Sequence, residues 1–461
     1  MSRSILILFM LALGLGLFVW LIEMPAENKR AQVEKESQQL MSFKESDVQS
    51  LTIRSTAAEI VLTRNLAAPA NSWTITQPRT MDADRQAIED FLRTLILAKV
   101  SRVVDETGKD LSTYGLASPA MSVSVRLPSG NQTVLFGDSG PLSSTLYAKR
   151  DGEQKVLLTS LAGREILIKG LQDFRRKRVF EFDHSRVSRL KITHPEQTVV
   201  LYKEGHGEKA VWTIKAPIQA PADQPEVKSL LFALENLKAQ AFVDDAQERH
   251  ALHKEFKTPL VSITVHEDSP DTAATGKDRT INLFMTPTNV TNAYAETSSN
   301  DPLYRVPAAA AKDLAKDLFA LRNKQLIASN AEQVKTLVIN KEGDEYSLTH
   351  EGPEWLIDGD PGAKADAARV DVLLNRAFQL QAERIVTDKP GDLKVYGLAP
   401  PAAEFTASDA QGKVMGQLFV GRVENNLAFA RGSALSGVFQ IRPDILREIP
   451  KRGDLAKPAA R

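Results

Sequence analysis

The sequence has no cysteine and no net charge, and each absence excludes a class of function. Its 461 residues include 58 basic and 58 acidic side chains. A chain without cysteine cannot form disulfides, thiolate zinc sites or cysteine-ligated iron–sulfur clusters, and it has no cysteine nucleophile. It also cannot be lipidated as a lipoprotein. The balanced charge gives no sign of the basic face that nucleic-acid-binding proteins carry, so we expect no nucleic-acid partner.

The longest hydrophobic run lies at the N-terminus. Eighteen consecutive uncharged residues extend from Ile5 to Ile22, at the short end of the ~17–25 residues that cross a bilayer. A cleaved signal peptide is the alternative, but its apolar region is ~7–15 residues long and is followed by a cleavage site of small residues. This run instead ends in the bulky residues Val19-Trp20-Leu21-Ile22. We therefore predict an uncleaved signal-anchor over residues 1–24.

The flanking charges predict the orientation of this anchor. Arg3 precedes the run, and Glu23 and Glu27 follow it, ahead of the basic pair Lys29 and Arg30. This arrangement mildly favours a cytoplasmic N-terminus, with the rest of the chain outside the cytoplasm. Ala12 and Gly16 put two small residues on one helix face, where a partner helix can approach closely. Residues 25–42 are polar and charged, and we predict that they form a stalk.

The remainder of the chain is three copies of one unit. Phe43-x4-Val48-x2-Leu51-x-Ile53 returns 139 residues later from Phe182, and its second half returns a further 147 residues later from Val334. Internal repeats of this kind define the architecture. We predict repeat units over residues 43–181, 182–327 and 328–461. The residues that mark the units are Trp73, Asp84, Tyr114, Gly115, Pro119, Trp212, Asp223, Trp355, Asp366, Tyr396, Gly397 and Pro401.

Each unit combines strands with one amphipathic helix. The aspartates Asp84, Asp223 and Asp366 stand before apolar residues spaced three and four apart, which predicts a helix with one buried stripe and an aspartate N-cap. Alternating segments bounded by Gly and Pro surround this helix and predict strands. The fold class is therefore α+β, with three repeated domains that each contain a mainly antiparallel sheet and one major helix.

These motifs resemble the DUF4340 family in their order and repetition. They are the single N-terminal span, Trp-x-Ile, the helix led by Ala-Asp, Tyr-Gly-Leu-x2-Pro, and a Leu-Phe segment that ends in a glycine turn. The middle unit departs from the pattern, because it has Phe256 with Pro259 in place of Tyr-Gly-Leu and Leu283-Phe284-Met285 in place of the glycine turn. The resemblance implies an accessory protein of the kind linked to gliding-type ABC transporters, and it supplies no catalytic residues.

We therefore expect a non-enzymatic protein of the bacterial inner membrane, with one span and its bulk in the periplasm. Its expected partners are the membrane subunits of an ABC transporter or other envelope proteins, and no cofactor is expected. A module that binds polysaccharide or peptidoglycan without a transporter is the alternative, and a hydrolase is a third hypothesis.

Two short motifs suggest chemistry but have simpler explanations. Gly137-Asp138-Ser139-Gly140 is similar to the segment around a serine-protease nucleophile, yet the first histidine of the chain, His184, lies downstream of Ser139, whereas those proteases place it upstream. His250, His253 and Glu255 are types of residue that bind zinc, but the spacing is not His-Glu-x-x-His. We interpret residues 244–255 as a charged connector and expect no metal site.

The densest basic cluster recurs where one unit meets the next. Arg175 and Lys177 lie near the end of the first unit, and Arg322 and Lys324 lie 147 residues later, near the end of the second. A basic run can bind phosphate or an anionic polymer. The recurrence favours a structural role instead, in which Arg175 and Arg322 bridge neighbouring domains through the planar guanidinium group.

Overall fold

The computed structural model describes residues 38–455, apart from residues 57, 66–71, 143, 161–168, 206, 270–274, 288 and 298–301. The predicted anchor Ile5–Ile22, with Ala12 and Gly16, lies outside these residues. None of the helices in the described part of the chain combines the length and the apolar character that a membrane span needs. The chain groups into two compact units, of which the first holds the first sheet and residues 239–242, and the second holds the other two sheets.

The described residues form three nine-stranded antiparallel sheets with one shared strand order. In every sheet the first strand lies near the middle and pairs with the second strand on one side and the sixth on the other. The first sheet runs β4 (Met81–Asp82), β3 (Ser72–Gln77), β2 (Glu59–Asn65), β1 (Ser50–Ser55), β6 (Met121–Leu127), β7 (Gly130–Ser139), β8 (Thr145–Arg150), β9 (Val156–Ser160) and β5 (Lys99–Asp105).

The second and third sheets repeat this order strand for strand. The second runs β13 (Ala220–Pro221), β12 (Val211–Ala216), β11 (Thr198–Glu204), β10 (Val187–Thr193), β15 (Val261–Glu267), β16 (Lys277–Thr286), β17 (Asn289–Thr297), β18 (Leu303–Pro307) and β14 (Ala241–Val243). The third runs β22 (Lys364–Ala365), β21 (Glu354–Ile357), β20 (Asp344–Glu351), β19 (Thr336–Lys341), β24 (Ala403–Ser408), β25 (Val414–Glu424), β26 (Leu427–Gly432), β27 (Leu435–Ile441) and β23 (Arg384–Thr387). The predicted α+β architecture of three repeated domains is confirmed.

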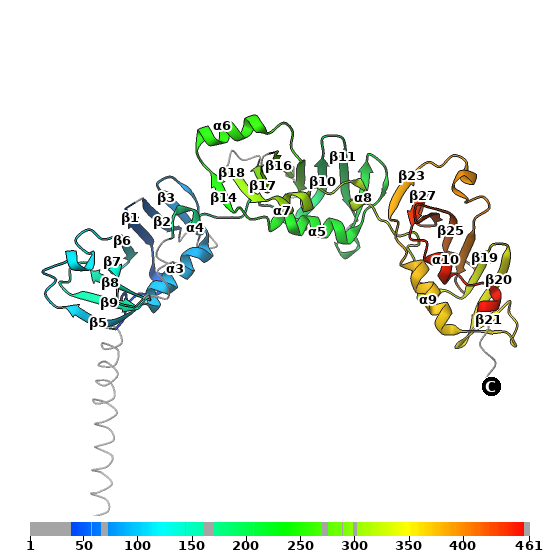
Figure 1. Cartoon of the computed structure of the whole chain (residues 1–461), viewed down its shortest axis with the longest axis horizontal. Coiled ribbons are helices and arrows are strands. Elements are labelled where there is room, and N and C mark those ends of the chain that lie inside the picture. The colour runs from blue at the N-terminus through cyan, green and yellow to red at the C-terminus, as the bar shows by residue number, and fades with distance from the viewer. Residues whose placement is uncertain are drawn as a thin grey trace, which may run out of the picture. The chain divides into compact units, whose positions relative to one another are not determined.

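One long helix follows the first four strands of each sheet, as the periodicity predicts (Figure 1). These helices are α3 (Arg85–Leu97), α5 (Gln224–Glu235) and α9 (Ala367–Phe378). Each turns an apolar stripe into its core: Ile88, Phe91, Leu92 and Leu95 in α3, Val227, Leu230, Leu231 and Leu234 in α5, and Val370, Leu373, Leu374, Ala377 and Phe378 in α9. The stripe is buried against the inward-facing residues of the central strands.

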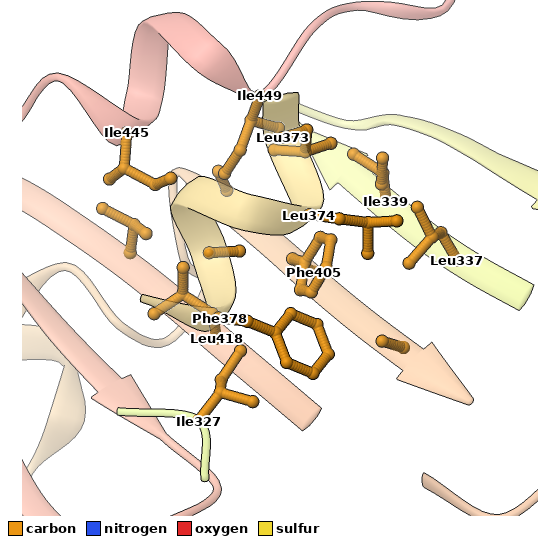
Figure 2. Close-up of a cluster of buried hydrophobic side chains, with 14 of the residues drawn as sticks. Ile327, Leu337, Ile339, Leu373, Leu374, Phe378, Phe405, Leu418, Ile445 and Ile449 are labelled. Carbon is orange, nitrogen blue, oxygen red and sulfur yellow. The ribbon is translucent and has the colours of Figure 1, made fainter. Parts of the chain in front are cut away.

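The third repeat shows how the helix and the sheet share one core (Figure 2). Leu373, Leu374 and Phe378 of α9 lie among Leu337 and Ile339 of β19 and residues of the neighbouring strands. Ile445 of α10 (Ile445–Glu448) and Ile449 come from the C-terminal part of the chain and belong to the same cluster. Burial of apolar area on this scale is the main source of stability for such a layered domain.

The structure differs from the predictions in two elements. Residues predicted as a charged connector form a helix, α6 (Ala246–Glu255), which has no fully buried side chain and packs Leu252 against a small core cluster. Gly137 and Gly421, predicted to lie in turns, lie inside β7 and β25 instead, next to irregularities in the strand register. The physical reason for the glycines is close packing within the sheet, described below.

Residues just before each predicted boundary pack with the repeat that follows. Leu40 and Met41, in the predicted stalk, are buried in the core of the first repeat. Leu326 and Ile327, assigned to the second unit, are buried in the core of the third. Backbone hydrogen bonds fix these segments beside the end of the long helix, from Leu40 N–H to Ala98 O and from Leu326 N–H to Leu380 O.

Candidate functional site

Each repeat buries one tryptophan in its third strand. Trp73 of β3, Trp212 of β12 and Trp355 of β21 are 3%, 4% and 3% exposed. The three tryptophans are therefore core residues of their repeats. Their rings are too deeply buried to act as open platforms for sugar stacking.

The residue paired across the strands from each tryptophan differs between the repeats. In the first repeat Arg64 pairs with Trp73, its guanidinium carbon lies 5.7 Å from the centroid of the indole ring, and its Nη1 donates to the carbonyl oxygens of Glu45 and Ser46. In the third repeat His350 pairs with Trp355 and stacks on it, with ring centroids 4.6 Å apart. In both repeats a side chain therefore covers the tryptophan.

The second repeat leaves the corresponding place open. Lys203 pairs with Trp212, but the described part of the chain gives its ammonium group no hydrogen bond or ion pair. A groove of about 710 Å³ lies here, between the β11–β12 hairpin, α5 and the 3-10 turn η5 (His184–Arg186). Its lining includes His184, Lys203, Trp212, Lys228, Phe232 and Glu235. A volume within the roughly 300–1,000 Å³ of known ligand sites makes this groove the candidate site.

One wall of the groove carries a fixed pair of ionisable groups. His184 of η5 and Glu235 of α5 lie close together, with Nδ1 3.0 Å from Oε2. Asp268, at the far end of the groove, accepts a hydrogen bond from Ser188 Oγ at 2.6 Å. Phe232 is 68% exposed beside them, so the groove combines charged groups with an open aromatic face.

A buried carboxylate holds one edge of the groove in place. Glu267 is 5% exposed and accepts hydrogen bonds from the Asp183 N–H, Arg186 and Arg279. Burial raises the pKa of Glu267, but these hydrogen bonds and the charges of Arg279 and Arg186 outweigh it and hold the pKa below its ordinary value. Glu267 therefore stays ionised and holds η5, one edge of the groove, against the end of β15.

The three repeat-marking aspartates cap the long helices. Asp84, Asp223 and Asp366 accept hydrogen bonds from the backbone N–H groups of Ala87, Glu226 and Ala368. This confirms the predicted N-caps. Their carboxylates serve the helix termini, and nothing in the geometry gives them a catalytic role.

The Tyr-Gly-Leu motif forms a tight turn against the sheet. Gly115 and Gly397 follow 3-10 turns and have φ of 67° and 66°, a left-handed conformation that favours glycine. Pro119 and Pro401 then lead into β6 and β24. The tyrosine of each turn packs on an aromatic residue of a neighbouring strand, with centroids 5.0 Å apart for Tyr114 and Tyr147 and 5.3 Å apart for Tyr396 and Phe429.

In the first and third repeats this turn packs directly on a strand glycine, where a larger residue would clash. A Cβ atom on Gly137 would lie 2.1 Å from Tyr114 O, and one on Gly421 would lie 2.3 Å from Tyr396 O. In the second repeat the register places Phe284 at this position, and its ring stacks on Phe256 with centroids 4.6 Å apart. The ring centroid of Phe256 also lies 5.5 Å from that of Tyr294, the counterpart of Tyr147 and Phe429, so the middle repeat keeps the aromatic contact and adds a second one in place of the glycine.

A family model matches three overlapping segments of the chain, residues 73–251, 212–361 and 355–454. Its description is "Domain of unknown function (DUF4340)". The chain belongs to the DUF4340 family. Each matched segment begins at one of the three buried tryptophans. Comparison with curated proteins gave no match, and neither did comparison with solved structures.

The basic residues near the repeat ends have structural contacts in this DUF4340 protein. Arg175 is 3% exposed, and its guanidinium carbon lies 3.7 Å from the centroid of the Phe242 ring. The Lys177 carbonyl accepts from the Ala239 N–H. These four residues belong to the same compact unit, so this cluster is engaged in packing.

The second basic cluster joins the end of the second repeat to the third. Arg322 is 3% exposed, forms an ion pair with Asp388 and lies over the ring of Phe439 at 5.5 Å. Lys324 Nζ lies 3.3 Å from Asp223 Oδ2 and donates to Ala320 O. These contacts correspond to the bridging role predicted for Arg322.

The structure places the residues of the two motifs that suggested chemistry on separate elements. Ser139 ends β7 opposite Leu146. On α6 the side chain of His253 contacts Arg249 O and Glu296, while His250 is exposed to solvent. Within the described ranges no three His, Asp or Glu side chains converge as a metal site would require.

Sequence reasoning missed the residues that cover the tryptophans. Lys203 lies 139 residues after Arg64, and His350 lies 147 residues after Lys203, which are the offsets that relate the repeated strands. This spacing identifies the three as equivalent. Only the strand register shows that each lies beside a tryptophan, and so only the structure reveals the groove.

Proposed function

We propose that this chain is a non-enzymatic, membrane-anchored accessory or scaffold subunit in the periplasm, part of an ABC-type transport or gliding-type envelope system. One observation carries the proposal: the residues that define the repeats are used for packing. The aspartates cap helices, the tryptophans fill cores, and the glycines admit a turn. Three such domains follow an apolar N-terminal run in the sequence. This arrangement suits a membrane-anchored protein that binds partners through its surfaces.

The anchor provides the second element of the proposal. Ile5–Ile22 is long enough to cross a bilayer, and the small residues Ala12 and Gly16 suit close packing against a membrane subunit. ATP hydrolysis is assigned to separate cytoplasmic subunits. This chain has no Gly-x4-Gly-Lys-Ser/Thr segment with which to bind nucleotide phosphates.

Affinity purification of the full chain in mild detergent tests this function. We expect the membrane subunit of an ABC transporter to co-purify with the natural chain. A variant with Ala12→Leu and Gly16→Leu keeps the apolar length but enlarges the small-residue face, and we expect it to lose the transporter subunit. Recovery of the natural chain without any transporter subunit would refute the proposal.

The groove of the second repeat favours a second candidate, a module that binds envelope polysaccharide or peptidoglycan without a transporter. Sedimentation of the full chain with cell-wall material distinguishes the two. Binding to the wall material in the absence of a co-purifying transporter supports the second candidate.

The hydrolase hypothesis has its own test. If the protein is non-enzymatic, Ser139→Ala, and separately His250→Ala with His253→Ala, leave any cellular phenotype of the natural chain intact. Loss of the phenotype with normal folding would support an enzyme.

A further inference from the structure

We propose that the groove of the second repeat binds an acidic saccharide, with the apolar face of a sugar on Phe232 and its carboxylates paired with Lys203 and Lys228. The inference rests on the second candidate function, recognition of envelope polysaccharide. It names the repeat, the side chains and the charge of the ligand.

The first support is the groove beside Trp212, a tryptophan whose ring is itself buried as in the other two repeats. Arg64 closes this place in the first repeat by bonding to Glu45 and Ser46, and His350 closes it in the third by stacking on Trp355. Lys203 does neither, and a groove of about 710 Å³ remains. Three copies of one domain therefore differ at the place where a ligand would enter.

The second support is the helix face that borders the groove. Lys228 stands five residues after the N-cap Asp223, where the first repeat has Glu89 and the third has Asp371. Phe232 stands where they have Arg93 and Asn375. The second repeat has thus exchanged an acid for a base and a polar side chain for an exposed aromatic ring. The exposed ring of Phe232 gives the groove an apolar surface beside its charged groups.

The third support is the balance of charge within the groove. His184 is paired with Glu235, and Arg186 with Asp183 and Glu267. Asp268 is held by Ser188 and lies 3.9 Å from His266. Among the contacts of the described residues, Lys203 and Lys228 have no acidic partner. These two ammonium groups supply positive charge for a carboxylate-bearing ligand.

Calorimetric titration of the full chain in mild detergent tests the proposal. The probe is an alginate oligomer, a chain of uronic acids. Neutral maltooligosaccharides test the need for charge, and poly-glutamate tests the need for a sugar. We expect alginate to bind and the two other probes to bind at least tenfold more weakly.

Matched variants assign the binding to the groove. Lys203→Gln with Lys228→Gln, and separately Phe232→Ser, are expected to weaken alginate binding at least tenfold. Lys191→Gln with Lys254→Gln removes the same charge from exposed positions outside the groove and is expected to leave binding within twofold. Thermal melts of all variants establish that folding is retained.

Several results would overturn the proposal. They are no alginate binding, equal binding of poly-glutamate or of the neutral sugar, and equal loss in the control variant. The groove variants keep the anchor, so any transporter subunit that co-purifies with the natural chain is expected to co-purify equally with these variants. Failure of saccharide binding is therefore separate from failure of the transporter association.

Discussion

Arg322 is a charged side chain that is almost fully removed from water, and it is paired with a carboxylate on the following repeat. Its guanidinium is 3% exposed, while Asp388 is 33% exposed. Removing one partner of a fully buried pair destabilises a protein by about 3–5 kcal/mol, because the other charge is left unpaired. The partial exposure of Asp388 reduces this figure.

We expect Asp388→Asn to lower the free energy of unfolding by about 2 kcal/mol. Glu424→Gln is the matched control. Glu424 forms an ion pair with Arg422, and the two side chains are 48% and 56% exposed. Such exposed pairs contribute about 0–1 kcal/mol. Urea unfolding of the two variants measures the difference. Equal, small effects would show that the Arg322–Asp388 pair does not hold the repeats together.

Glu267 gives the stability of the second repeat a defined pH dependence. Its pKa in the folded protein lies below the ordinary value, so the unfolded chain binds the proton more readily than the folded one. The stabilisation is therefore complete above the ordinary glutamate pKa of about 4.3 and is lost as the pH falls through the lower, folded value. We expect Glu267→Gln to lower the melting temperature at pH 7 and to do so less at pH 3.5.

Glu196→Gln is the control for this pH series, because Glu196 is exposed. It is expected to leave the melting temperature nearly unchanged at both pH values. A Glu267→Gln effect that is equal at pH 7 and pH 3.5 would contradict the assigned ionisation.

At the scale of elements, the contact between the Tyr-Gly-Leu turn and its strand fixes a glycine. Gly421→Ala would bring Cβ within 2.3 Å of Tyr396 O, and we expect a loss of about 1–3 kcal/mol through overpacking. Gly391→Ala, in the same repeat, meets no atom within 4 Å and is expected to change stability by less than about 1 kcal/mol. Thermal melts compare the two, and equal effects would show that the turn moves freely away from the strand.

The contact that Arg64 makes in the first repeat can be introduced into the second repeat by a substitution. Lys203→Arg keeps the positive charge, but a guanidinium there is expected to reach the carbonyl oxygens of His184 and Ser185, as Arg64 reaches Glu45 and Ser46. We expect a higher melting temperature and weaker alginate binding. Unchanged alginate binding with Lys203→Arg would show that the groove does not need to be open.

Sequence patterns predicted the elements that depend on local periodicity. The stripes of α3, α5 and α9 and their aspartate caps follow from spacing and residue type alone. The helix α6 could not be predicted because it has no fully buried side chain and only Leu252 packs on a core cluster, so it has no apolar stripe to detect. Gly137 was assigned to a turn because its role depends on Tyr114 O, an atom from a distant segment that sequence spacing does not locate.

At the scale of the whole molecule, three domains of one fold stand behind a predicted anchor. The offsets of 139 and 147 residues revealed the triplication, and the three sheets share one strand order. The candidate site could not be predicted from the sequence, because it depends on side chains that differ between the three repeats. Its side chains come from a turn, a hairpin and a helix, and only the fold brings them together.

The proposed location predicts the behaviour of a C-terminal reporter. Alkaline phosphatase, which folds only outside the cytoplasm, is expected to be active when fused after Arg461, and β-galactosidase at the same position is expected to be inactive. The reverse pattern would place the repeats in the cell interior and would exclude the proposed periplasmic scaffold.

The two ends of each repeat are tied to opposite ends of its long helix. The segment that enters is bonded just after the helix, from Leu40 to Ala98, Val179 to Leu237 and Leu326 to Leu380. The segment that leaves is bonded to the N-cap, since Asp84, Asp223 and Asp366 donate to Phe174, Leu321 and Leu455. A helix of 12 or 13 residues is roughly 20 Å long. Tension applied along the chain would therefore be carried from one end of each long helix to the other.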